Sequence, residues 1–119
     1  NLTAQWELSD FAVHLRRGKS PRFHLKLSRA GENHEIELED GEGPIDAAFL
    51  ATEKLTGVPM NCREFKINAT SLGHDALGEV TLSIEHNGHE YRGRGVSTDC
   101  VEASLVAILS AINRIPSVQ

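Results

Sequence analysis

The chain has 119 residues, a net charge of −5 at pH 7 and an isoelectric point near 5.6. This length suits a single domain with a real core rather than a large enzyme, and the acidic balance argues against a nucleic-acid surface, which would present a basic face. No apolar run approaches the roughly 20 residues that span a bilayer, so no membrane partner is expected.

The start of the chain, NLTAQWELSDF, has neither an initiator methionine nor the charged-then-apolar plan of a signal peptide. We therefore expect a piece of a longer protein that is located in the cytoplasm. The two cysteines, Cys62 and Cys100, are too few for a disulfide framework. Two buried, reduced thiols are expected instead.

The first half of the chain has the pattern of three strands. Residues 6–16 mix apolar and polar side chains and end in a loop signal, whereas residues 22–30 alternate strictly, as a strand does. One face of this second segment carries Phe23, Leu25 and Leu27. A turn at 31–33 and another alternating segment at 34–40 predict a hairpin.

A helix is predicted after this hairpin. It follows a glycine turn, and Pro44 suits its first position because the missing N–H would have no partner there. Gly57 is expected to end it. The residues at helical spacing, and hence the expected buried face, are Ile45, Ala48, Phe49 and Leu55.

The second half repeats this plan. Residues 62–72 and 78–85 alternate as strands, Asn87-Gly88 is a strong signal for a two-residue hairpin turn, and residues 89–95 form the returning strand. Thr98 is expected to be the N-cap of the second helix. Its buried stripe is expected to be Val101, Leu105, Ile108, Ile112 and Ile115.

The two halves can be aligned with each other. An offset of 55 residues (89 − 34) places His34 on His89 and also Leu27 on Leu82, and the first strand needs an offset one residue smaller. We therefore predict an α+β fold in one domain, 1–119. It would consist of two pseudo-symmetric β-β-β-α units, about 6–57 and 61–116, with the helices packed on antiparallel three-stranded sheets.

A β-β-β-α unit leaves one sheet face and its edges open. Pairing of the two units, and of two chains, would bury more of that surface. A homodimer is therefore expected, and a monomer whose edges are protected by charge is the alternative.

The turn from Gly41 to Gly43 is the first candidate for chemistry. Glycines allow close backbone approach, and the exposed N–H groups of a helix start suit a carboxylate or phosphate. The alternative is that these glycines serve only the backbone conformation. The segment is neither a Walker loop nor a dinucleotide fingerprint.

Other constellations do not support catalysis. His86 and His89 flank a hairpin tip without a cluster of metal-ligand spacing, so solvated histidines are expected. There is no G-x-S-x-G elbow, and neither cysteine lies in a motif with a histidine base. The carboxylates of residues 35–42 are interpreted as a solvated strand face. We expect no catalytic residue, no metal and no cofactor in this chain.

Three blocks of sequence carry a family resemblance. The stretches DGEGPIDAAFLATEKLTG, INATSLGHDALGEVTLSIEHNG and YRGRGVSTDCVEASLVAILSAINR occur in order and together resemble the C-terminal regulatory (LeuA dimer) domain of 2-isopropylmalate synthase. The resemblance runs from about Leu8 to Arg114. The family domain has two pseudo-symmetric β-β-β-α units, as inferred above from the repeat.

The resemblance implies a regulatory function. Enzymes of this family condense acetyl-CoA with 3-methyl-2-oxobutanoate on a TIM barrel that needs a divalent metal, at the first committed step of leucine synthesis. Leucine binds between paired regulatory domains and inhibits the catalytic barrel. This chain would then carry the sensor, with the barrel as its partner in the parent chain.

The resemblance also implies effector-binding residues. Backbone N–H groups at the helix starts would take the amino-acid carboxylate, Asp46 the ammonium, and an apolar cavity the side chain. Carried over position by position, the site consists of Gly41, Gly43, Ile45, Asp46, Cys62, Phe65, Ala69, Ala76 and Cys100.

Some positions depart from the family pattern. A tyrosine is common where this chain has Phe65, and aliphatic residues are usual at Cys62 and Cys100. These changes bear on the identity of the effector. The alternatives are a regulatory domain of citramalate synthase that senses isoleucine, a dimerisation brace without ligand binding, and, with least support, a free-standing small enzyme.

Overall fold

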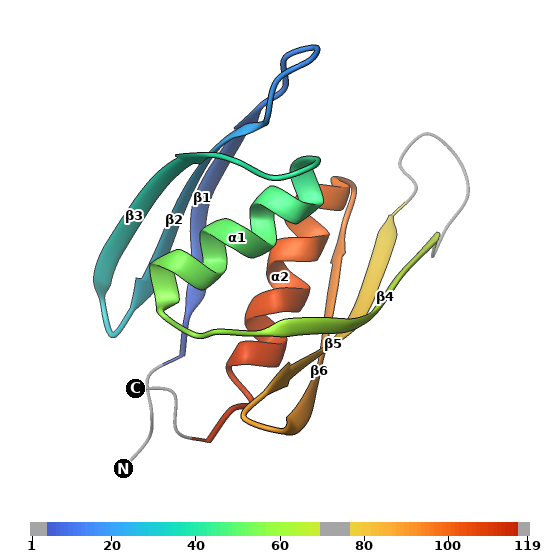
Figure 1. Ribbon diagram of the computed structural model, residues 1–119. Helices are drawn as coiled ribbons and strands as arrows, with labels where there is room; N and C mark the ends of the chain where they lie inside the picture. Colours follow the sequence, from blue (N-terminus) through green and yellow to red (C-terminus); the bar gives the residue numbers. More distant parts are fainter. Residues whose placement is uncertain (1–4, 70–76, 117–119) are drawn as a thin grey trace.

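The computed structural model describes residues 5–69 and 77–116. The order of elements is β1 (Glu7–His14), β2 (Arg22–Arg29), β3 (Glu32–Glu39), α1 (Pro44–Thr56), β4 (Asn61–Ala69), β5 (Gly78–His86), β6 (His89–Ser97) and α2 (Cys100–Ile112). Two antiparallel three-stranded sheets, β1-β2-β3 and β4-β5-β6, flank the two helices, which pack against each other (Figure 1). The predicted α+β fold of two β-β-β-α units is confirmed.

Both hairpins are closed by the same kind of turn. Asn87 and Gly88 have φ angles of 53° and 81°, and Ala30 and Gly31 have 55° and 80°. Two consecutive positive φ values are those of a type I′ turn, whose twist matches that of the strands it joins. The turn expected at 31–33 therefore lies at Ala30-Gly31. The sequence concealed it because an alanine adopts the left-handed conformation there, at a cost of about 1 kcal/mol.

The strand register corrects the alignment of the two halves. Phe11 lies opposite Leu25 in the first sheet, and Phe65 lies opposite Leu82 in the second. Leu25 is thus the equivalent of Leu82, and the expected match of Leu27 to Leu82 is wrong by two residues. A two-residue shift keeps each side chain on the same face of its strand, so the predicted fold survived the error.

A shared irregularity supports the corrected alignment. A β-bulge lies between Leu8 and Asp10 in β1, and another lies between Cys62 and Glu64 in β4. The first is opposite Leu27 and the second is opposite Ile84. A bulge bends its strand and increases the local twist, so both sheets curve at equivalent points.

The core lies where the inner faces of the sheets meet the helices. The central strands supply Phe23, Leu25, Leu27, Val80, Leu82 and Ile84, all buried. The expected stripe of α2 is buried except for Val101, which is half-buried. In α1 the prediction is weaker: of its expected buried residues only Ala48 is fully buried, and the helix buries Ala47, Ala51 and Thr52 instead.

The helix α2 lies unusually close to β6. A Cβ atom added to Gly93 would lie 1.9 Å from the carbonyl oxygen of Ala107, and one added to Gly95 would lie 2.2 Å from that of Ala103. Glycines facing alanines therefore allow direct contact between the two backbones. At the equivalent positions of β3 stand Ile36 and Leu38, both half-buried, so α1 is separated from its sheet by side chains.

The helix ends follow ordinary capping rules, with one correction. Pro44 is in the first turn of α1 and Gly57 is its C-cap, as expected. The N-cap of α2 is Asp99 rather than Thr98, because the Asp99 carboxylate accepts hydrogen bonds from the N–H groups of Val101 (2.7 Å) and Glu102 (3.3 Å).

Each helix has 13 residues. Within the described ranges neither is long and apolar enough to cross a membrane.

Candidate functional site

The glycine turn between β3 and α1 has a demanding geometry. Gly41 has a φ of 100°, and a Cβ atom there would lie 3.0 Å from the backbone nitrogen of Ala47. Gly43 is extended, and a Cβ atom there would have nothing within 4 Å. The conformational interpretation therefore accounts for Gly41, whereas the space beside Gly43 stays open.

The first turn of α1 offers two backbone donors to that space. Pro44 has no N–H, and Ala47 donates to the Gly43 carbonyl at 2.9 Å. Among the described residues no hydrogen-bond partner exists for the N–H groups of Ile45 and Asp46. Unpaired N–H groups at a helix start carry the positive end of the helix dipole, so this turn suits a carboxylate.

Asp46 has a structural role as well as its expected one. Its Oδ2 atom accepts a hydrogen bond from the N–H of Glu42 at 2.9 Å, and this contact holds the turn against the helix. The Oδ1 atom has no partner among the described residues. The carboxylate can therefore brace the turn and still accept from an ammonium group.

The second part of the expected site lies on β4. Cys62, Phe65 and Ala69 lie opposite Ile84, Leu82 and Gly78 of β5. Directly paired residues share a face of a sheet, and Leu82 and Ile84 are buried, so these β4 side chains lie on the inner face.

This inner face of β4 is incompletely covered. Cys62 and Ala69 are exposed, Ile67 between them is 47% exposed, and β4 contains no fully buried residue. Phe65 meets α1, where its ring lies 6.4 Å from that of Phe49 at an interplanar angle of 62°. An apolar strand face that is exposed in this way leaves room for a ligand or for another chain.

The structure links the turn to β4 through α1. Ile45 and Phe49 are four residues apart and share a face of that helix, and Phe49 contacts Phe65. No hydrogen bond, ion pair or ring contact among the described residues joins Ala69 or Cys100 to the turn. Ala76 lies outside the described residues. Sequence reasoning did not assign Phe49 and Ile67 to this site, although their spacing from Ile45 and Phe65 was available to show it.

The expectation of buried thiols is wrong. Both cysteines are unpaired and exposed. Cys100 is the first residue of α2, and Cys62 lies on the uncovered face of β4. The Cys62 thiol is nevertheless partly shielded and lies 3.4 Å from the Glu64 carbonyl oxygen, and this burial raises its pKa above the ordinary value.

Of the two hairpin histidines, His89 is exposed, as expected, whereas His86 is half-buried. His86 lies with its Nδ1 atom 2.6 Å from the carbonyl oxygen of Pro59. Across residues 5–69 and 77–116, no three histidine, cysteine, aspartate or glutamate side chains are placed to hold a metal ion.

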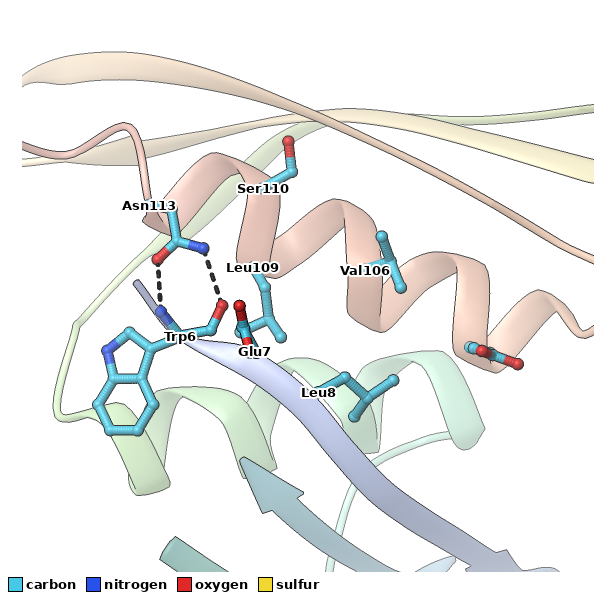
Figure 2. A pocket seen from close by; sticks show the side chains of 8 residues that line it. Trp6, Glu7, Leu8, Val106, Leu109, Ser110 and Asn113 are labelled. Atoms are coloured by element: carbon cyan, nitrogen blue, oxygen red, sulfur yellow. Dashed lines mark hydrogen bonds between the residues drawn. The ribbon is translucent and has the colours of Figure 1, made fainter. Parts of the chain in front are cut away.

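A separate groove of about 380 Å³ lies between the start of β1 and the outer side of α2 (Figure 2). At one end the Asn113 side chain bridges to Trp6, accepting from its N–H and donating to its carbonyl oxygen, both at 2.9 Å. Arg29 lies over the Trp6 ring at 4.3 Å. No sequence motif indicated this groove, because its two walls are about 100 residues apart. Its lining residues are Trp6, Glu7, Leu8, Glu102, Val106, Leu109, Ser110 and Asn113.

Comparison with known proteins identifies a family for the chain. The profile of the LeuA allosteric (dimerisation) domain matches residues 1–116. Several curated proteins named 2-isopropylmalate synthase are similar to the chain.

Three of these relatives illustrate the range. The protein of Rhodopirellula baltica is 45% identical over 111 residues, which cover 93% of this chain and 21% of the relative. That of Ruminiclostridium cellulolyticum is 49% identical over 86 residues, covering 72% and 17%. That of Pyrococcus furiosus is 39% identical over 103 residues, covering 87% and 21%.

The chain thus spans about a fifth of the length of the relatives it matches. The family profile extends over nearly the whole chain, and the resemblance read from its three sequence blocks is confirmed. The chain belongs to the family of LeuA allosteric (dimerisation) domains.

Proposed function

We propose that this chain is the regulatory domain of a 2-isopropylmalate synthase and that it binds leucine as a feedback effector. The family profile and the relatives named 2-isopropylmalate synthase support the regulatory assignment. The observation that carries leucine binding is the pair of unpartnered N–H groups of Ile45 and Asp46, at a helix start that leads to the uncovered face of β4.

In this proposal each part of an amino acid has its own partner. The carboxylate accepts from the two N–H groups, and the ammonium lies against the free oxygen of Asp46. The isobutyl group lies against Phe49, Phe65 and Ile67, which are apolar and only partly covered. An apolar cavity with a few convergent polar groups is the usual form of a small-molecule site.

The proposal includes a homodimer. The uncovered inner face of β4, on which Ile67 is 47% exposed, gives a second chain an apolar surface to bury. Leucine would then bind where the two copies meet. The catalytic barrel, its divalent metal and acetyl-CoA belong to the remainder of a parent enzyme in the cytoplasm.

The test is calorimetric titration of the 119-residue chain with leucine, isoleucine and valine, together with its mass in solution. Leucine binding to a dimer is the expected result. Preference for isoleucine would assign the domain to a citramalate synthase. A folded dimer that binds none of the three would be a dimerisation brace, and the effector proposal would be abandoned.

Variants of Asp46 separate its two roles. Asp46→Asn keeps an oxygen for the Glu42 N–H but removes the charge, whereas Asp46→Ala removes both. We expect both variants to weaken leucine binding and only Asp46→Ala to loosen the turn. Asp10→Ala is the matched control, because Asp10 also accepts a backbone N–H, that of Phe11 at 2.9 Å, on a distant strand. If Asp46→Asn binds leucine as tightly as the unaltered chain does, the charge of Asp46 takes no part in effector binding.

A further inference from the structure

The loop between β1 and β2 is basic in an acidic chain. The loop contains Arg16, Arg17 and Lys19, and Arg22 follows as the first residue of β2, although the net charge of the chain is −5. In Figure 1 this loop extends beyond the body of the first sheet. Three of these four side chains reach into solvent, whereas the Arg16 side chain is 24% exposed.

Arg16 turns toward the end of β3. Its guanidinium donates to the Ser20 carbonyl oxygen at 3.2 Å and to the Glu39 carboxylate, and its Nε atom is buried. Arg17, next to it, is exposed and has no ion pair or hydrogen bond among the described residues. The two arginines therefore provide a natural comparison.

Glu39 is the last residue of β3, four residues before the N-cap of α1. One of its carboxylate oxygens meets Arg16, and the other lies 3.7 Å from an Arg22 nitrogen. The hydrogen bond and charge of Arg16 hold the pKa of Glu39 below its ordinary value. The carboxylate is therefore charged at neutral pH and is held from two sides.

The next residues continue this contact into the glycine turn. The N–H of Asp40 donates to the Pro21 carbonyl oxygen at 3.1 Å, so the basic loop holds two successive residues. The Asp40 side chain in turn accepts from the N–H of Gly41 at 2.8 Å. The basic loop and the turn are thus connected through consecutive hydrogen bonds.

Among the described residues, the second unit has no charge pair at the position of Arg22 and Glu39. Arg22 lies opposite Glu39 in the first sheet, and the corresponding pair in the second sheet is Glu79 and Val96. Val96 cannot form an ion pair, and Glu79 instead contacts Arg94. The second β-β-β-α unit therefore forms without a charge pair at this place, so the unit does not require the pair in order to fold, although the pair can add to stability.

We propose that Arg16 is a positioning residue for effector binding: through Glu39 it holds the segment between β3 and α1 so that the N–H groups of the turn converge on the ligand. The inference rests on the proposed function. It extends the site to a residue on a different hairpin, which touches no ligand.

The test compares Arg16→Gln with Arg17→Gln, which removes the same charge from the same loop. Leucine affinity is measured by calorimetry, and the unfolding temperature is measured alongside. We expect Arg16→Gln to weaken leucine binding by about threefold to tenfold and Arg17→Gln to leave it unchanged. Equal affinities in the two variants would overturn the proposal.

A double-mutant cycle distinguishes positioning from a general loss of stability. If Arg16 acts through Glu39, then Glu39→Gln weakens binding to a similar extent, and the double variant loses no more than either single variant. Fully additive losses would mean that the two residues act independently, and the proposal would fail.

Failure of the proposed function can be recognised separately. If the unaltered chain binds no leucine, amide hydrogen exchange at Gly41 and Gly43 still reports on the turn. Faster exchange in Arg16→Gln than in Arg17→Gln would retain Arg16 as the residue that positions the turn. Equal exchange would refute that role whatever the ligand.

Discussion

The glycine at position 93 provides the most demanding test of the packing. Its absent side chain lets β6 lie against α2, and an added Cβ atom would be 1.9 Å from the Ala107 carbonyl oxygen and 2.8 Å from the Ala111 nitrogen. Ordinary contact distances for these pairs are about 3.4 Å, so strand and helix must separate by roughly 1 Å or more. Because both obstructing atoms are backbone, no rotamer change relieves the overlap.

We expect Gly93→Ala to destabilise the chain by about 3 kcal/mol, the upper part of the range for overpacked cores. In a domain of this size that corresponds to a fall in unfolding temperature on the order of 10 °C. The measurement is urea unfolding followed by circular dichroism, with a thermal scan as a second readout.

Gly78→Ala is the matched control. Gly78 lies in the same sheet, and a Cβ atom there would lie 3.6 Å from the Ser97 carbonyl oxygen, which is ordinary contact. The control is expected to stay within about 1 kcal/mol of the unaltered chain. If Gly93→Ala were as stable as Gly78→Ala, β6 and α2 would not be in direct backbone contact, and the account of this packing would be wrong.

Three further predictions concern other parts of the chain. Asp99→Ala is expected to lower the free energy of urea unfolding by about 1 kcal/mol, because it removes the N-cap of α2, whereas Thr98→Ala should leave it nearly unchanged. A larger loss of stability in Thr98→Ala would show that Thr98 is the N-cap. Asn113→Ala removes both hydrogen bonds to the Trp6 backbone. It is expected to lower the free energy of unfolding by about 1–3 kcal/mol and to speed hydrogen exchange of the Trp6 amide. Unchanged exchange at Trp6 would contradict this prediction. Folding lowers the pKa of Glu39, so the stabilising contribution of its carboxylate is complete above the ordinary carboxyl pKa of 4.5 and is lost as pH falls through the lower value. The difference in unfolding free energy between the unaltered chain and Glu39→Gln should therefore shrink in acid. A difference that stays constant with pH would contradict the charge pair.

Much of the fold was predictable because one face of each central strand is buried. Alternation in β2 and β5 identified strands and faces, and Asn87-Gly88 identified one hairpin. The turn of the other hairpin was not predicted at Ala30-Gly31, because alanine does not favour a positive φ. The close approach of β6 to α2 could not be predicted from the sequence either, because a glycine within a strand pattern does not indicate which element packs against it.

The site was predictable only as far as its motifs extend. The glycine turn was found from its residues and Asp46 by resemblance, but the hydrogen bond from the Glu42 N–H to Asp46 depends on the path of the turn in space. The exposure of Cys62 depends on whether a helix covers β4, which composition does not encode. The pairing of Arg16 with Glu39 joins segments 23 residues apart, and a charge pattern alone does not select that partner.

The backbone contact between β6 and α2 also bears on how the two halves of a duplicated domain can diverge. At Gly93 and Gly95 no residue with a side chain can be introduced without separating α2 from β6. The second half therefore tolerates little change in residue size where α2 contacts β6. In the other half, Ile36 and Leu38 fill the corresponding space and can be exchanged for larger or smaller apolar residues with local repacking. We therefore expect natural substitutions that change effector preference to accumulate around α1. The packing of α2 on β6 should change little among such variants.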